Sequence, residues 1–97
     1  IGVDKNQNYL HPGQVLTSML KRVDLVVYES FNGEVESGIH ILGVESGMVG
    51  YAMDEFNAEL VSDEMKAMVD AASAQIVSGE LMVHDYVSDE TCPAIEF

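Results

Sequence analysis

The 97-residue sequence has little positive charge. Four Lys and Arg residues stand against 17 Asp and Glu residues, which gives a formal net charge of −13. Proteins contact a nucleic-acid backbone through clustered Lys and Arg, and they bind an anionic membrane surface in the same way. The composition therefore argues against both kinds of partner.

Cysteine and long apolar runs are also scarce. The single cysteine, Cys92, excludes an internal disulfide and a zinc site built from several cysteines. Its place near the C-terminal end does not suit an N-terminal lipid-attachment cysteine. No apolar run approaches the roughly 20 residues that span a bilayer. The sequence opens with Ile-Gly-Val-Asp rather than Met and carries no signal peptide, so we expect a processed or truncated piece of a longer protein.

Residues typical of metal sites and of catalysis occur only in isolation. His11, His40 and His84 are spread along the chain, and none is spaced with a second ligand as in a metal-binding motif. We expect no metal site, and we expect His40, which stands between two isoleucines, to point out of a half-buried strand. The sequence has no nucleophile elbow, phosphate-binding loop or dinucleotide fingerprint. These features predict a protein without a cofactor and without enzymatic activity.

The composition is nevertheless that of a globular chain, with 47% hydrophobic residues, and the spacing of these residues predicts two amphipathic helices. The first follows Arg22 and stops at Asn32-Gly33, and the second runs from the N-cap Ser62 to Gly79. We expect one apolar stripe of the second helix to face the core. Its members are Met65, Met68, Val69, Ala72 and Ile76.

Short runs rich in β-branched residues predict strands before, between and after these helices. A turn at 45–47 separates two of them, and the first is expected to be buried. The predicted strands cover 1–4, 15–20, 38–44, 47–53 and 80–87. Because strands alternate with amphipathic helices, we predict an α/β fold in which a sheet packs against flanking helices.

Two charged residues stand at the ends of predicted strands. Asp4 ends the first strand and Lys21 ends the second, next to Arg22, so that two of only four basic residues are adjacent. In open α/β sheets, ligands bind beyond the carboxyl ends of the strands. A carboxylate there can accept hydrogen bonds from vicinal hydroxyls, and a Lys ammonium donates up to three. The residues alone leave two interpretations open: Asp4 and Lys21 bind a ligand, or Asp4 forms a structural ion pair with Lys21 or Arg22.

The sequence contains, in this order, IGVDKNQ, VLTSMLKRVDLVVYES, LGVESGMVGYAMDEFN and AQIVSGELMV. Together these segments resemble the C-terminal third of the basic membrane protein family, over residues 1–84. The family consists of substrate-binding lipoproteins of ABC importers, and its best-understood branch receives purine nucleosides. The resemblance implies the C-terminal segment of a type I periplasmic-binding-protein fold. In that fold a ligand lies between two α/β lobes, and the chain crosses the hinge between them three times.

The same resemblance implies how residues 1–97 are divided. Residues 1–14 would form a strand and loop of one lobe, 15–22 a hinge crossing, and 23–86 an α/β segment. Residues 87–97 would form an irregular tail without a counterpart in the family.

The resemblance also implies two ligand-binding residues. In family members the Asp of the GVD strand contacts the ribose hydroxyls, and that position is Asp4 here. The Lys of the TSxxKR motif also reaches the ligand, and that position is Lys21, whereas Arg22 is expected to make a structural contact. The other family contacts, including aromatic residues that sandwich the base, would lie in an N-terminal two-thirds that this sequence lacks.

Two functions from different classes remain open. The first is the C-terminal part of a nucleoside receptor, held as a lipoprotein in the periplasm or on the outer face of the membrane, with an ABC permease as its partner. The second is a regulatory or interaction module that keeps the fold without transport. A lipid-modified cysteine upstream of Ile1 would favour the first, and a cytoplasmic start the second. In either case we expect the chain to associate with its missing part or with another copy of itself.

Overall fold

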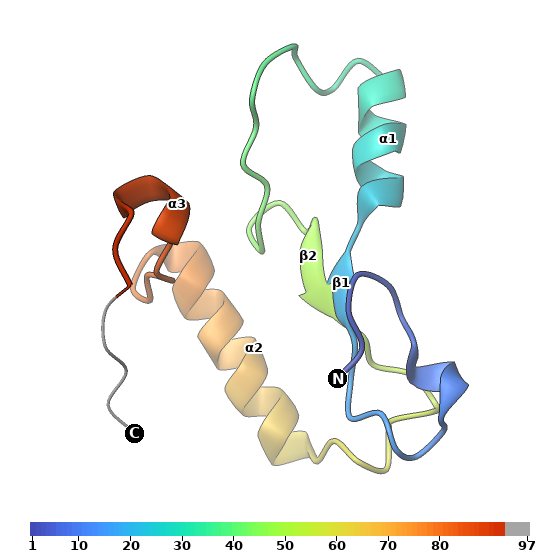
Figure 1. Cartoon of the computed structure of the whole chain (residues 1–97). Helices are drawn as coiled ribbons and strands as arrows, with labels where there is room; N and C mark the ends of the chain where they lie inside the picture. Colours follow the sequence, from blue (N-terminus) through green and yellow to red (C-terminus); the bar gives the residue numbers. More distant parts are fainter. Residues whose placement is uncertain (93–97) are drawn as a thin grey trace.

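The computed structural model describes residues 1–92 and forms a small α/β arrangement around a two-stranded sheet (Figure 1). The sheet lies between the N-terminal loop on one side and the longest helix on the other (Figure 1). The elements are the 3-10 helix η1 (Asn8–Leu10), β1 (Met19–Lys21), α1 (Val23–Phe31), β2 (Val49–Tyr51), α2 (Asp63–Ser78) and α3 (Tyr86–Asp89).

Three backbone segments meet side by side at the sheet. β1 and β2 pair antiparallel, with Met19 opposite Tyr51 and Lys21 opposite Val49. On the other edge of β1, Gly2 forms an isolated parallel bridge with Ser18. The expected strand at 1–4 is therefore reduced to a single bridge. It is also not buried, because Ile1 is 81% exposed.

Both predicted helices are confirmed, together with the residues that end them. α1 ends at Phe31 with Asn32 as its C-cap, and Gly33 follows with a positive φ of 75°. At the start of α2, the Ser62 hydroxyl accepts a hydrogen bond from the Met65 amide at 3.2 Å, as an N-cap should. At its end, Gly79 adopts the left-handed conformation, with φ of 80°, that glycine allows at low cost.

Two of the predicted strands are wrong. Residues 38–44 form a loop, in which Ile39 is 99% and Ile41 is 89% exposed. Residues 80–87 form no strand either, and their end instead enters α3. A β-branched run becomes a strand only where another strand pairs with it, and within residues 1–92 no segment pairs with either run. The predicted irregular tail begins within α3, and its last five residues, 93–97, lie outside the described residues.

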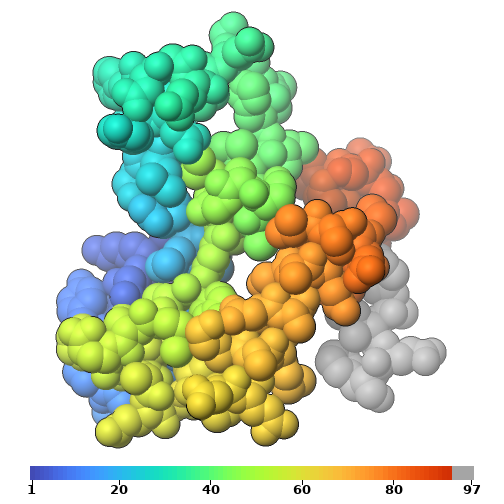
Figure 2. Space-filling view, turned by 180° about the vertical axis from the view of Figure 1, so that it is seen from behind, coloured from blue at the N-terminus to red at the C-terminus, as the bar shows by residue number. Residues whose placement is uncertain are grey.

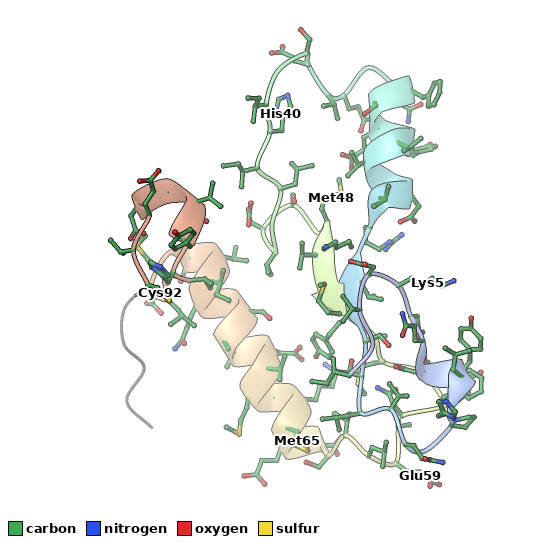
Figure 3. The ribbon with its side chains drawn as sticks, viewed as in Figure 1. Lys5, His40, Met48, Glu59, Met65 and Cys92 are labelled. Atoms are coloured by element: carbon green, nitrogen blue, oxygen red, sulfur yellow. The ribbon has the colours of Figure 1, made fainter. Side chains whose placement is uncertain are left out.

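The described part of the chain has a small core. Its buried apolar residues are Met48 and Ala52. The apolar stripe of α2 does not face this core: Met65 is 41% and Met68 is 68% exposed, so their expected role as core filler is wrong. α2 extends away from the sheet (Figures 1 and 3). No helix within residues 1–92 is both long and apolar enough for a membrane crossing.

Candidate functional site

A pocket of about 280 Å³ lies where the N-terminal segment meets the end of β1 and the start of α1. Three of the four basic residues of the chain line it, together with two carboxylates. The lining residues are Asp4, Lys5, Asn6, Leu20, Lys21, Arg22 and Asp24. In a chain with a net charge of −13, this is where positive charge is concentrated.

Asp4 and Lys21, the two predicted ligand-binding residues, lie together in this pocket. The Lys21 ammonium is 2.9 Å from Oδ1 of Asp4, and the two side chains remain 56% and 66% exposed. The backbones are also joined, because the Lys21 amide donates to the Asp4 carbonyl at 2.9 Å. The ion pair that the structural interpretation required is therefore present. Exposed ion pairs add little to stability, so breaking this pair would cost the fold little.

The backbone of Asp4 has an uncommon conformation. Its φ of 72° lies in the left-handed region, which Asp visits more readily than most residues but still at a cost. Residues held in such conformations persist only where their surroundings fix them, and they are frequent at ligand-binding sites. This geometry turns the Asp4 carbonyl toward the Lys21 amide while its carboxylate reaches the Lys21 ammonium.

Arg22 makes a different contact from Lys21. Its guanidinium donates to both carboxylate oxygens of Asp24, at 3.0 Å to Oδ1 and 2.8 Å to Oδ2. This hydrogen-bonded pair raises the pKa of Arg22 and lowers the pKa of Asp24. Arg22 also stands immediately before α1. The expectation that Arg22 makes a structural contact is confirmed.

Next to the pocket lies a polar cluster that the sequence did not predict, formed by Asn6, Asn8, Ser18, Asp54 and Asn57. Oδ2 of Asp54 accepts from the side-chain amides of Asn6, at 2.6 Å, and Asn8, at 3.1 Å. The Ser18 hydroxyl donates to Oδ1 of Asn8 at 2.8 Å. Asn8, Ser18 and Asn57 are fully buried. In the described part of the chain, buried hydrogen bonds therefore accompany apolar packing at the centre of the fold.

Asn57 extends the polar cluster to the loop that follows β2. Its side-chain amide donates to the carbonyls of Leu16, at 2.8 Å, and Ala52, at 3.0 Å, and its Oδ1 accepts from the Asp54 amide at 2.9 Å. The loop after β2 thereby packs against the N-terminal segment (Figure 2). The amide of Asn6, followed by the Phe56 backbone amide, holds the pKa of Asp54 below its usual range.

His40 and His84 lie outside this site. His40 is on the exposed loop between α1 and β2 (Figure 3), with Nε2 2.7 Å from the Glu36 carbonyl. The strand from which it was expected to point is absent. His84 lies near α3, with Nδ1 3.7 Å from Asp89. Within residues 1–92, no group of three His, Cys, Asp or Glu side chains is arranged to hold a metal ion.

The fold and the site define a small α/β segment that brings opposite charges together where three backbone segments meet. Comparison with known proteins finds sequences that are similar to this segment. Basic membrane protein A of Borreliella burgdorferi is 34% identical over 86% of this chain, and basic membrane protein A of Borreliella afzelii is 29% identical over the same share. No family model matches the chain.

The chain is therefore related to the basic membrane protein family, as the four sequence segments predicted. It spans about a quarter of the length of these relatives, since the matches cover 25% of one and 26% of the other.

Proposed function

We propose that this chain is the C-terminal part of the solute-binding component of an ABC importer, and that the complete protein takes up purine nucleosides. The observation that carries the proposal is the exposed Asp4–Lys21 pair in the charged pocket. A carboxylate and an ammonium fixed side by side can accept from and donate to neighbouring hydroxyls of one ribose. The role needs binding and release of a solute, without catalysis.

The arrangement of the three backbone segments supports a hinge at this position. The segments around Gly2, Ser18 and Ala52 are joined by backbone hydrogen bonds: the Met19 amide donates to Gly2, and the Ala52 amide to Ser18, each at 2.9 Å. In a type I periplasmic-binding-protein fold, three such crossings connect two lobes and border the ligand cleft. On this proposal residues 15–22 are one crossing, and Asp4 and Lys21 stand at the edge of the cleft.

The exposed apolar surfaces support a further part of the proposal. The loop at 38–44 and one face of α2 present large apolar side chains to solvent, and surfaces of this kind mark contacts with other polypeptide. We propose that these surfaces contact the part of the complete protein that corresponds to the remaining three-quarters of the relatives' length. The complete protein would act as a lipoprotein in the periplasm or on the outer face of the membrane, and would deliver the nucleoside to an ABC permease.

Calorimetric titration of the full-length protein that contains this segment tests the proposal. Inosine or adenosine should bind with submicromolar affinity, whereas the corresponding free bases should bind more weakly because they lack the ribose that Asp4 and Lys21 would contact. The 97-residue chain alone should bind nucleosides weakly or not at all, because it supplies one side of the cleft. A full-length protein that binds neither nucleosides nor free bases would refute the assigned solute, and would favour the alternative of a regulatory or interaction module.

A further inference from the structure

We infer that Asp54, 50 residues away from Asp4 in the sequence, is a positioning residue for Asp4. The inference rests on the proposed function in one respect, namely that Asp4 contacts the solute. Asp54 itself is not among the residues that line the charged pocket. It would act on the solute only by holding the segment that carries Asp4.

Asp4 needs to be held in place by its surroundings. Its φ of 72° is costly for a residue with a side chain. The carbonyl of Asp4 is fixed by the Lys21 amide at 2.9 Å, and the carbonyl of Val3 accepts from the Gln7 side-chain amide at 2.9 Å. Both bonds require the loop that follows Asp4 to fold back along β1.

Asp54 fixes the loop that follows Asp4. Its Oδ2 accepts from Asn6, two residues after Asp4, and from Asn8. The Asn6 side chain is held at its other end as well, because its Oδ1 accepts from the Asn8 backbone amide at 2.9 Å. One carboxylate oxygen therefore closes the Asn6–Asn8 turn and draws it against the loop after β2.

Asp54 is itself held by two backbone hydrogen bonds. Its Oδ1 accepts from the Phe56 amide at 2.9 Å, and its own amide donates to Oδ1 of the fully buried Asn57. The carboxylate therefore has a defined position from which it orders the loop. A positioning residue of this kind needs support from its own neighbours, and Asp54 has it.

Two readouts on the full-length protein test the inference. The first, without ligand, is hydrogen exchange of the Lys21 amide, which donates to Asp4, compared with the Arg22 amide, which donates to Met48 at 2.8 Å. In Asp54→Ala, the Lys21 amide should exchange about tenfold faster while the Arg22 amide changes less than about twofold. Asp54→Asn, which keeps an acceptor, should give a smaller change and provides the test if the Ala variant does not fold.

The control variant is Asp85→Ala. Asp85 also accepts a local backbone hydrogen bond, from Val87 at 3.1 Å, but it caps α3 on the other side of the sheet (Figure 1). Asp85→Ala should leave the hydrogen-exchange rates of the Lys21 and Arg22 amides unchanged. Equal acceleration of the Lys21 and Arg22 amides by Asp54→Ala would show a general loss of stability, and no acceleration would show that the loop holds without Asp54. Either result would overturn the inference.

The second readout is nucleoside affinity. Asp4→Asn should weaken inosine binding by at least about tenfold in the wild-type background and by less than about threefold in the Asp54→Ala background, because Asp4 is no longer held in place. Equal losses in both backgrounds would contradict a positioning role. If the full-length protein binds no nucleoside, the proposed function fails, and the exchange measurement alone decides the role of Asp54.

Discussion

Tyr51 donates its phenolic hydrogen to Oδ1 of Asp70 across 2.6 Å and so joins the end of β2 to the middle of α2. Lys66, one turn before Asp70, forms an ion pair with the other carboxylate oxygen. The hydrogen bond raises the pKa of Tyr51, and Lys66 followed by Tyr51 lowers the pKa of Asp70. Within residues 1–92 the helices and strands make close backbone contacts only between β1 and β2, so we expect this hydrogen bond to limit the motion of α2 relative to β2.

Tyr51→Phe should release α2 from the sheet without melting the helix. The helix keeps its own N-cap and its Gly79 stop, so the far-ultraviolet circular dichroism should stay unchanged while NMR relaxation reports greater motion of α2 relative to β2. Tyr28→Phe on α1 is the matched control, because it removes the same hydroxyl from a residue that is 64% exposed. Unchanged α2 motion in Tyr51→Phe would contradict this role of the hydrogen bond.

Acid should weaken the polar cluster. The pKa of Asp54 lies below its usual value because the Asn6 amide donates to the ionised carboxylate. A carboxylate with a depressed folded-state pKa contributes stability that is complete above the unfolded-state value of about 4. That contribution is lost as the pH falls through the lower folded-state pKa. In Asp54→Asn, the free energy of unfolding should therefore fall less steeply than in the wild type as the pH is lowered below about 4.

The control for this acid effect is Glu59→Gln. It removes the same charge from the same loop, but Glu59 is exposed and makes no hydrogen bond within residues 1–92. In urea unfolding at a series of pH values, Glu59→Gln should leave the decrease of the free energy of unfolding at low pH as steep as in the wild type. If both variants make this decrease equally less steep, the general relief of negative charge explains the effect rather than the cluster.

The close contact at Gly2 predicts a destabilising substitution. A Cβ at this position would lie 2.5 Å from the Ser18 hydroxyl oxygen, which donates to the buried Asn8. Gly2→Ala should therefore lower the free energy of unfolding by about 1–3 kcal/mol. Gly50 on β2 has open space at the same point, so Gly50→Ala should be neutral or stabilising by up to about 1 kcal/mol. Equal effects in urea unfolding would contradict the predicted clash.

The apolar face of α2 should drive association when the 97-residue chain is studied alone. Met68 is 68% exposed on this face. Met68→Lys should shift the chain toward monomer in sedimentation velocity, because charge on an apolar contact surface opposes association. Ala67→Lys places the same charge on the opposite side of the helix by helical spacing and should have less effect. A wild-type chain that sediments as a single monomer would contradict the prediction.

Local signals predicted the helices of this protein, and they failed where structure depends on distant partners. The capping residues act within a few residues of themselves, so the roles of Ser62, Gly33 and Gly79 were predictable from the sequence. The strands at 38–44 and 80–87 were not, because strand formation depends on a neighbouring strand. The exposure of Met65 and Met68 escaped prediction for a similar reason, since an apolar stripe does not reveal what covers it.

The candidate site divides in the same way. Asp4 and Lys21 could be found because each follows a β-branched or apolar run and matches a family motif, and the structure brings them to 2.9 Å. The polar cluster could not be found, because Asn6 and Asp54 are 48 residues apart and no spacing rule joins them. Its one visible signal was the density of Asn and Asp in KNQN and MDEFN, which is also typical of ordinary turns.

The most direct test of the account is the affinity of Asp4→Ala and Lys21→Met in the full-length protein, measured by calorimetry beside the melting temperature of the same variants. If Asp4 accepts hydrogen bonds from ribose hydroxyls, inosine affinity should fall by at least about tenfold in Asp4→Ala. Binding of the free base should change little. Lys21→Met keeps the packing of the stem and should also weaken nucleoside binding. Lower melting temperatures with unchanged inosine affinity in both folded variants would contradict the account and leave Asp4–Lys21 as a structural ion pair.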